Sequence, residues 1–171
     1  DGKKGIKVIP CYYKKDYPEW SDRGDGPGAP VAIHLPNSPI ITTGKRDGSK
    51  IRLPNGNYLE ETASYYVMVE TKTGGFTPAL ITMKSTQLNV SKKWNSMMKT
   101  IQIPDGKGGF VIPPMHGVVY NLSSTLQKND KGSWYGWVVT QDRILGQTDK
   151  ALYLSAKDFS GNVSKGNVQT K

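Results

Sequence analysis

The sequence predicts a mainly β protein built on a five-stranded OB-like barrel, with one helix between strands 3 and 4. Three observations predict this class. Short runs of β-branched and aromatic residues are separated by Gly- and Pro-rich turns along the chain of 171 residues. Four of these runs pair as two hairpins, and a segment with helical periodicity lies between the hairpins. One more strand before the first hairpin completes the order of elements of an OB-fold.

The first predicted strand covers residues 5–13. Pro10 lies inside it, and proline lacks the N–H group that a sheet ladder uses, so we expect an edge position or a β-bulge there. Residues 16–61 show no strong periodicity and contain several Gly and Pro turns. They predict a long basic loop inserted between strands 1 and 2, with a short extended piece at residues 40–43.

Residues 64–72 are the clearest strand, because their side chains alternate between two faces. The alternation places Tyr65 on one face and Tyr66 on the other. A Thr-Gly-Gly turn at residues 73–75 leads into residues 76–83, which we expect to form the second strand of this hairpin.

One strong helix is predicted at residues 85–102. Its apolar side chains fall at helical spacing on one face, and they are Val90, Trp94, Met97 and Ile101. The opposite face is polar and basic, and it carries Lys92, Asn95, Lys99 and Gln102. We therefore expect the helix to pack on the sheet with Trp94 in the core.

Two elements complete the predicted fold. Residues 117–126 and 133–140 predict a second hairpin around the basic turn at residues 128–132. A short C-terminal helix follows, and we expect Gly161 to end it. The apolar face of this helix carries Leu152, Ala156 and Phe159.

Composition narrows the class of protein. A chain of this length can bury a core as one domain, which we place at residues 1–171. Cys11 is the only cysteine, so no internal disulfide can form, and a reducing compartment is indicated. The sequence has no apolar run long enough to span a membrane, so we expect no membrane association.

Charge and aromatic residues suggest a ligand. The formal net charge is +9, and aromatic side chains stand among lysines at residues 11–17, 92–94 and 131–137. Cations neutralise phosphates and flat rings stack on unpaired bases, so a protein that binds single-stranded nucleic acid needs both. An OB-fold grips oligonucleotides with the loops between strands 1 and 2 and between strands 4 and 5, which are the basic insertion and the 128–132 turn here.

The candidate nucleic-acid-binding residues are aromatic or basic side chains near these segments. They are Tyr12, Tyr13, Lys14, Lys15, Lys45, Arg46, Lys50, Arg52, Tyr66, Lys72, Lys128, Lys131, Trp134, Tyr135 and Trp137. Strand alternation puts Trp134 on one face and Tyr135 with Trp137 on the other, so we expect at least one of these faces in the core. The alternative is that the aromatics are core side chains and the cations form a solvated loop.

Catalytic patterns are weak, and we expect no enzymatic activity, no metal and no other cofactor. His34 and His116 are the only histidines, and neither has metal-ligand spacing to Cys11 or to an acid. The Glu-Thr-Lys sequence at residues 70–72 is similar to a Glu-x-Lys nuclease element. A metal-dependent nuclease would need a further carboxylate beside it, and strand alternation explains these residues without chemistry. A metal-dependent nuclease is the second alternative function.

Three runs of the sequence resemble a group of tailed-phage proteins over most of the chain. They are residues 5–13, residues 83–88 with Trp94-Asn95, and residues 129–137. The resemblance implies an OB-type protein that binds single-stranded DNA in phage replication and recombination. It also implies the cytoplasm of an infected bacterial host as its location, and replication or recombination proteins as further partners.

The sequence therefore predicts a non-catalytic, largely sequence-independent single-stranded DNA-binding protein. The alternative from a different class is a virion structural or decoration protein, because a basic β domain with long arms would also serve there. Salt-sensitive binding to single strands distinguishes the two.

Overall fold

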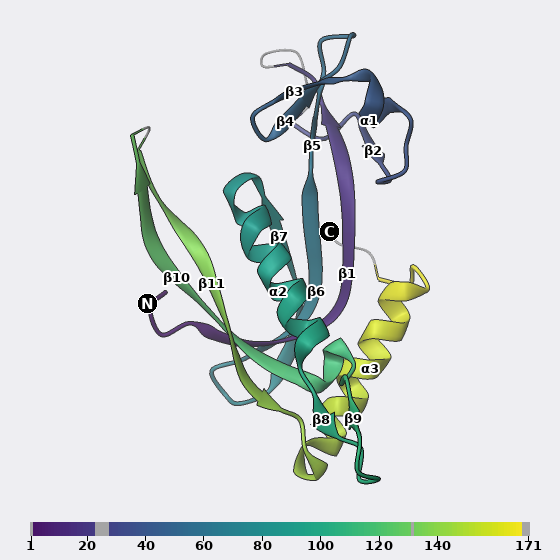
Figure 1. The fold of residues 1–171 in the computed structure, drawn as a ribbon, viewed down its shortest axis with the longest axis vertical. Helices are drawn as coiled ribbons and strands as arrows, with labels where there is room; N and C mark the ends of the chain where they lie inside the picture. Colours follow the sequence, from purple (N-terminus) through teal and green to yellow (C-terminus); the bar gives the residue numbers. More distant parts are fainter. Residues whose placement is uncertain (1, 23–27, 131, 169–171) are drawn as a thin grey trace.

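The computed structural model describes residues 2–22, 28–130 and 132–168. The protein is mainly β, with a strongly curled antiparallel sheet that forms a half-barrel and two long helices (Figure 1). Within these ranges, no helix is long and apolar enough to cross a membrane. Lys131, one of the candidate residues, lies outside the described residues.

The strand β1 (Ile6–Trp20) is the centre of the sheet. It pairs with β10 (Val118–Asn129) on one edge and with β6 (Thr62–Glu70) on the other. The strand β7 (Phe76–Lys84) pairs with β6, and β11 (Gly132–Ile144) pairs with β10, all antiparallel. Both predicted hairpins are therefore confirmed. The order β10-β1-β6-β7 is that of a Greek key, in which the fourth strand returns to lie beside the first.

A β-bulge in β1 decides which aromatic side chains enter the core. The register with β6 shifts between Pro10 and Tyr12, so Cys11 is the extra residue and the irregularity expected at Pro10 is confirmed. After the bulge, Tyr12 pairs with Tyr66 and Tyr13 with Tyr65. Because Tyr65 is fully buried and Tyr66 is half-buried, the shift sends Tyr13 towards the core and Tyr12 to the outer face of the sheet.

The predicted helix forms as a 3-10 turn (Ser85–Gln87) followed by α2 (Leu88–Thr100). Trp94 is fully buried, as predicted, with its ring stacked on Tyr65 at 4.3 Å between centroids and edge-on to Tyr120 at 5.6 Å. The helix ends at Thr100, earlier than predicted, because Ile101 takes an extended conformation (φ −65°, ψ 128°).

The 3-10 turn and α2 stand beside the open side of the half-barrel. In the part of the chain that the structure describes, β7 and β11 are the end strands and no ladder joins them. Gln87 bridges this gap, because its Oε1 accepts a hydrogen bond from the backbone N–H of Trp137 at 3.0 Å. The 3-10 turn that follows β7 is thereby joined to β11 by a side-chain hydrogen bond, and not by strand pairing.

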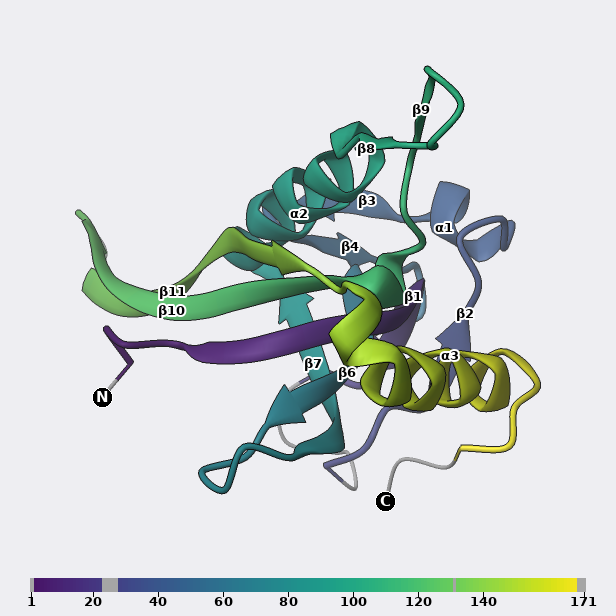
Figure 2. The ribbon, with the colours of Figure 1, turned by 90° about the horizontal axis from the view of Figure 1, so that it is seen from below.

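The second long helix, α3 (Lys150–Ser164), covers the other side of the sheet, and Figure 2 shows α2 and α3 on opposite sides of β1. Ala156 is fully buried in a second apolar cluster with Leu152 and Phe159, so the predicted face is confirmed. The predicted end at Gly161 is wrong. A glycine costs a helix interior only about 1 kcal/mol, and the left-handed residue that follows this helix is Gly166 (φ 75°).

Residues 16–61 are not a long loop, and this prediction was wrong. The C-terminal half of β1 continues into a small β unit at the top of Figure 1. The elements of this unit are β2 (Ala32–His34), α1 (Ile40–Thr43), β3 (Lys45–Asp47), β4 (Lys50–Arg52) and β5 (Tyr58–Glu60). Its core is formed by Tyr17, Ile51, Leu53 and Leu59. Strands of three residues are too short to show alternation, which is why the sequence pattern missed them.

The extended piece expected at residues 40–43 is the helix α1. Pro39 starts this turn with φ −58°, a value that suits a helix. The hydroxyl of Thr42 donates to the Pro39 carbonyl at 2.7 Å, and that of Thr43 donates to the Ile40 carbonyl at 2.8 Å. These side-chain bonds supplement the single helical turn.

A short hairpin after α2, which we call the finger, was also not predicted. It consists of β8 (Ile103–Pro104) and β9 (Phe110–Val111), and a 3-10 turn at Met115–Gly117 leads from it into β10. The Asp105 carboxylate accepts hydrogen bonds from the N–H groups of Lys107 and Gly109, at 2.7 and 2.9 Å. This turn chemistry closes the finger.

Candidate nucleic-acid interface

One group of candidate residues meets on the outer face of the sheet. The rings of Tyr12 and Tyr66 lie edge to face, with centroids 6.1 Å apart. Lys14, two residues after Tyr12 on the same face, is exposed, and its Nζ lies 3.1 Å from a carboxylate oxygen of Asp16. We call Tyr12, Lys14 and Tyr66 the outer-face cluster.

The electrostatics of this cluster keep Lys14 charged. Partial burial alone would lower the pKa of Lys14, but the hydrogen bond and charge of Asp16 outweigh it and raise the pKa above its usual value. Tyr66 and Tyr12 contribute in the same direction. Lys14 therefore stays protonated beside the two aromatic rings, with its charge paired to Asp16.

Tyr13 and Lys15 project to the opposite side of β1 and are engaged within the protein. The Tyr13 ring packs against Tyr65 with centroids 5.0 Å apart. Lys15 forms an ion pair with Glu61 at 3.0 Å, and its ammonium group lies 5.7 Å from the centre of the Tyr17 ring. These two candidates do not join the outer-face cluster.

A second group of candidates lies on the β3–β4 hairpin. Lys45 and Arg46 are exposed on β3. Lys50 sits over the Tyr58 ring at 3.8 Å from its centre. Arg52 contacts the carboxylates of Asp22 and Asp47 at 3.2 and 3.4 Å. Two of the four candidate cations on this hairpin, Lys50 and Arg52, thus already make contacts within the protein.

The third group lies on the end of the β10–β11 hairpin that projects beyond the sheet (Figure 1). We call residues 123–130 and 132–137, the described part of this hairpin end, the arm. Tyr135 is 72% exposed, and its cross-strand partner Leu126 is 59% exposed. Trp137 packs against the main core instead. Tyr135 and Trp137 share a face of β11, as predicted. The core ends between them, so Tyr135 is exposed whereas Trp137 is partly buried.

Two further candidates on the arm differ from Tyr135. Trp134 is half-buried, and its ring N–H is buried without a hydrogen-bond partner among the described residues. Its neighbours across a shallow depression include Ser85 and Thr86 at the start of the 3-10 turn. Lys128 is exposed near the tip.

An open hollow of about 720 Å³ lies against the arm. Its lining residues are Gly2, Lys3, Ser124, Thr125, Leu126 and Tyr135. The N-terminal segment reaches it because the Gly2 carbonyl accepts a hydrogen bond from the Ser124 N–H at 2.8 Å. The sequence pattern pointed to Tyr135 but missed Lys3 and Leu126. The lysines at the start of the chain could have pointed to Lys3, and the alternation along β10 could have pointed to Leu126.

Lys72 lies apart from these groups. It is exposed in the turn between β6 and β7, where the Thr71 hydroxyl accepts a hydrogen bond from the Gly75 N–H at 3.1 Å. The fold does not bring Lys72 into contact with the outer-face cluster.

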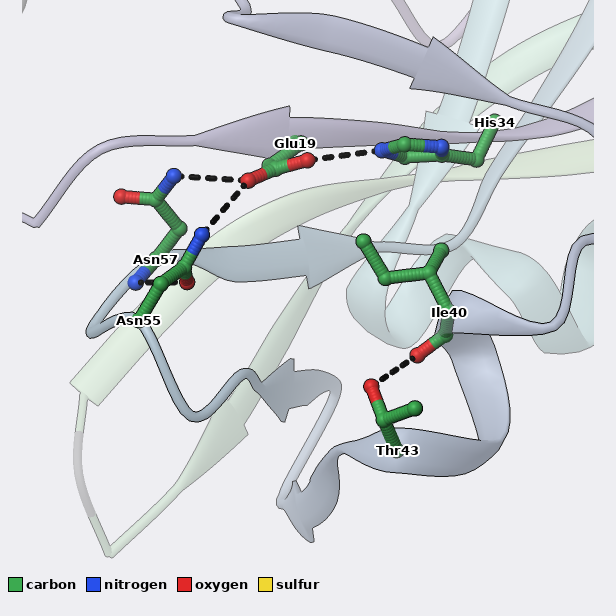
Figure 3. Close-up of polar contacts among 6 residues, drawn as sticks. All are labelled: Glu19, His34, Ile40, Thr43, Asn55 and Asn57. Carbon is green, nitrogen blue, oxygen red and sulfur yellow. Dashed lines mark hydrogen bonds and ion pairs between the residues drawn. The ribbon is translucent and has the colours of Figure 1, made fainter.

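A buried polar cluster around Glu19 was not predicted (Figure 3). Its carboxylate accepts hydrogen bonds from the amide nitrogens of Asn57 and Asn55, at 2.6 and 3.3 Å, and contacts His34 Nε2 at 2.7 Å. The bonds from Asn57 and His34 are the largest causes of a Glu19 pKa below its usual value. The cluster ties β1 to β2 and to the turn before β5. The spacing of His34 in the sequence gave no sign of this contact, because pairing of β1 with β2 is what brings Glu19 to it.

Residues 2–169 match the model of one protein family, described as Pam3 phage gp34-like protein. The chain belongs to this family. It is therefore a phage protein, and the phage origin that the resemblance implied is confirmed. Neither a curated protein nor a solved structure matches the chain.

Among residues 2–22, 28–130 and 132–168, no three His, Cys, Asp or Glu side chains gather as a metal-ligand group. Glu70, from the Glu-x-Lys sequence, is exposed at the end of β6. On the arm, the exposed apolar side chains Tyr135 and Leu126 lie beside the positively charged Lys3.

Proposed function

We propose that the protein binds single-stranded DNA without catalysis and largely independently of sequence. The observation that carries the proposal is the arm, where exposed Tyr135 and Leu126 adjoin a hollow also lined by Lys3. Exposed apolar side chains that lie together beside a hollow are a feature of ligand-binding surfaces. A base stacked on such a ring contributes about 1–3 kcal/mol.

The sheet topology supports an OB-type interpretation. An OB-fold is a five-stranded, partly open Greek-key barrel that binds oligonucleotides between the loops after strands 1 and 4 and on the face of strands 2 and 3. The five strands β1, β6, β7, β10 and β11 occur in that order along the chain, with α2 between β7 and β10. In this interpretation the arm is the loop after strand 4, and the small β unit replaces the loop after strand 1.

Charge supports a polyanionic ligand. The net charge is +9, and the exposed cations include Lys45, Arg46 and Lys128. Exposed cations can release counterions from a phosphate backbone, which makes binding strong at low salt and weak at high salt. We place the function in phage replication and recombination, in the cytoplasm of an infected host, with proteins of those processes as partners.

A titration with oligo-dT tests this proposal. We expect the tryptophan fluorescence to change on binding, and the affinity to fall with a log–log salt slope of about −0.7 per neutralised phosphate. The strand should remain intact when Mg²⁺ or Mn²⁺ is added. Failure to bind at low salt would refute DNA binding, and metal-dependent cleavage would refute the non-catalytic part.

One observation favours a second candidate, a virion structural protein. Val31, Ile33 and Leu35, at alternate positions along the β2 segment, are all exposed and apolar, as an assembly surface would be. This role predicts assembly or co-purification with capsids and no salt-sensitive binding to oligo-dT. The same titration therefore separates the two candidates.

A further inference from the structure

A small hollow lies between α2 and the segment that follows β9. Its volume is about 280 Å³. It is lined by Tyr13, Asn95, Met98, Lys99, Ile112 and Met115. None of these residues belongs to the arm, and Tyr13 is the only one that the sequence pattern singled out as a candidate. The hollow is therefore a separate place at which a ligand could bind.

The walls of the hollow suit a flat aromatic guest. Tyr13 is held in place by its ring contact with Tyr65, and two thioether side chains, Met98 and Met115, supply polarisable surface. Thioether sulfur makes favourable contacts with aromatic rings. Ile112 at the rim is 57% exposed, which leaves its side chain available to cover a bound ring.

Asn95 adds a hydrogen-bonding group to these apolar walls. One end of its amide contacts the Tyr65 hydroxyl at 3.0 Å, and that hydroxyl also contacts Ser91 Oγ at 2.7 Å. The amide nitrogen is the second hydrogen-bonding group of the same side chain. An amide fixed at one end can bind the polar edge of a base with its other end.

The surroundings of the hollow favour an anion. None of the six lining residues is acidic, and Lys99 is one of them. Lys92 lies seven residues before Lys99 on α2. Both lysines are exposed. An apolar protein side chain would not need this positive surface, whereas the phosphates on either side of a nucleobase would. Charge complementarity therefore favours a nucleobase with its phosphates over an apolar protein side chain.

We propose that this hollow binds one unpaired nucleobase of a single strand, with Lys99 and Lys92 at the adjoining phosphates. The inference rests on the proposed single-stranded DNA binding and adds to it a base site separate from the arm. Tyr13 then forms a wall of the base site, with its other side packed on Tyr65.

Methyl NMR tests the base site directly. The methyl groups of Met98, Met115 and Ile112 should shift when oligo-dT is added, because a bound base places a ring next to them. An abasic strand of the same length has the phosphates but no bases, so it should leave these methyl groups unmoved. Equal shifts with both strands would overturn base binding.

Two pairs of variants complete the test. Ile112→Ser should weaken oligo-dT binding about tenfold, which lies within the range of one stacked base. The matched control is Ile33→Ser, because Ile33 is 59% exposed on β2 and is not among the residues that line the hollow. Lys99→Ala should reduce the salt slope by about 0.7, whereas Lys150→Ala on α3 should not change it.

The outcomes separate this inference from the proposed function. If oligo-dT binds to the parent protein but the methyl groups stay unmoved and Ile112→Ser binds as tightly as Ile33→Ser, the base site is wrong and the DNA-binding function stands. If oligo-dT does not bind at all, both are wrong. Methyl shifts caused by an apolar peptide but not by oligo-dT would identify the hollow as a protein-docking site and overturn the inference.

Discussion

The side-chain oxygen of Gln87 accepts a hydrogen bond from the backbone N–H of Trp137 at 3.0 Å, across the open side of the curled sheet. The contact joins the 3-10 turn before α2 to the edge strand β11. It satisfies an edge N–H that a closed barrel would pair with another strand. The stability of the half-barrel therefore depends in part on one glutamine.

Replacing Gln87 by Ala should lower the free energy of unfolding by about 1–3 kcal/mol, because a partly buried N–H loses its acceptor. Denaturant unfolding measures this loss. Gln102→Ala is the control, since Gln102 is exposed just after α2 and its replacement should stay within about 0.5 kcal/mol of the parent. Equal stability of the two variants would mean that the bond contributes nothing.

The Glu19 cluster should make stability depend on pH. The Glu19 pKa is lower in the folded protein than its ordinary value of 4.5, so the folded state takes up a proton less readily than the unfolded state. The contribution is fully present above pH 4.5 and is lost as the pH falls through the lower, folded value.

Glu19→Gln tests this dependence, because glutamine removes the titrating group at nearly the same size. The difference in unfolding free energy between parent and variant should shrink as the pH falls below 4.5. Asn57→Ala removes the largest cause of the lowered pKa and should bring the Glu19 pKa closer to its ordinary value. A pH-independent difference for Glu19→Gln would contradict the linkage.

The β3–β4 hairpin should contact phosphate mainly through two of its four candidate cations. Lys45→Ala with Arg46→Ala should flatten the salt slope of oligo-dT binding by about 0.7 per lost phosphate contact. Lys50 and Arg52 already contact Tyr58 and nearby carboxylates, so their double alanine variant should change the slope less and reduce stability more. The reverse order of slopes would show that the wrong pair was assigned.

Tyr135 and Trp137 should respond oppositely to leucine, which retains apolar volume but cannot stack. Tyr135→Leu should weaken oligo-dT binding by about 1–3 kcal/mol without loss of stability. Trp137→Leu should reduce stability by about 1–3 kcal/mol, because it shrinks a half-buried side chain that packs against the core, and should leave binding unchanged while the protein is folded. Binding by Tyr135→Leu as tight as that of the parent would remove stacking from the arm.

The Cys11 thiol should be unreactive in the folded protein. The thiol is buried, and it donates a hydrogen bond to the Ile9 carbonyl with 3.4 Å between Sγ and the oxygen. Burial raises the pKa of the thiol to about 12. Since the thiolate is the reactive form, this shift lowers the reactive fraction about a thousandfold at neutral pH. A thiol reagent should label the protein only in denaturant, and rapid labelling under native conditions would contradict the burial.

Local pattern was enough to predict the elements that repeat a period over many residues. The hairpin of β6 and β7 and the helix α2 follow from alternation and from the spacing of apolar side chains, because each residue's environment there depends on its near neighbours. The same reasoning predicted the buried Trp94 and the apolar face of α3. The basic charge and the aromatic segments were also visible in the sequence, although their roles were not.

Tertiary structure decided the environment of each candidate residue. A single extra residue at Cys11 decides that Tyr13 rather than Tyr12 faces the core, and the end of the core separates Tyr135 from Trp137. The small β unit in residues 16–61 and the pairing of Glu19 with His34 depend on contacts between segments far apart in the chain. Sequence periodicity reports which side a residue faces, whereas the burial of that side depends on how far the neighbouring strand or helix extends.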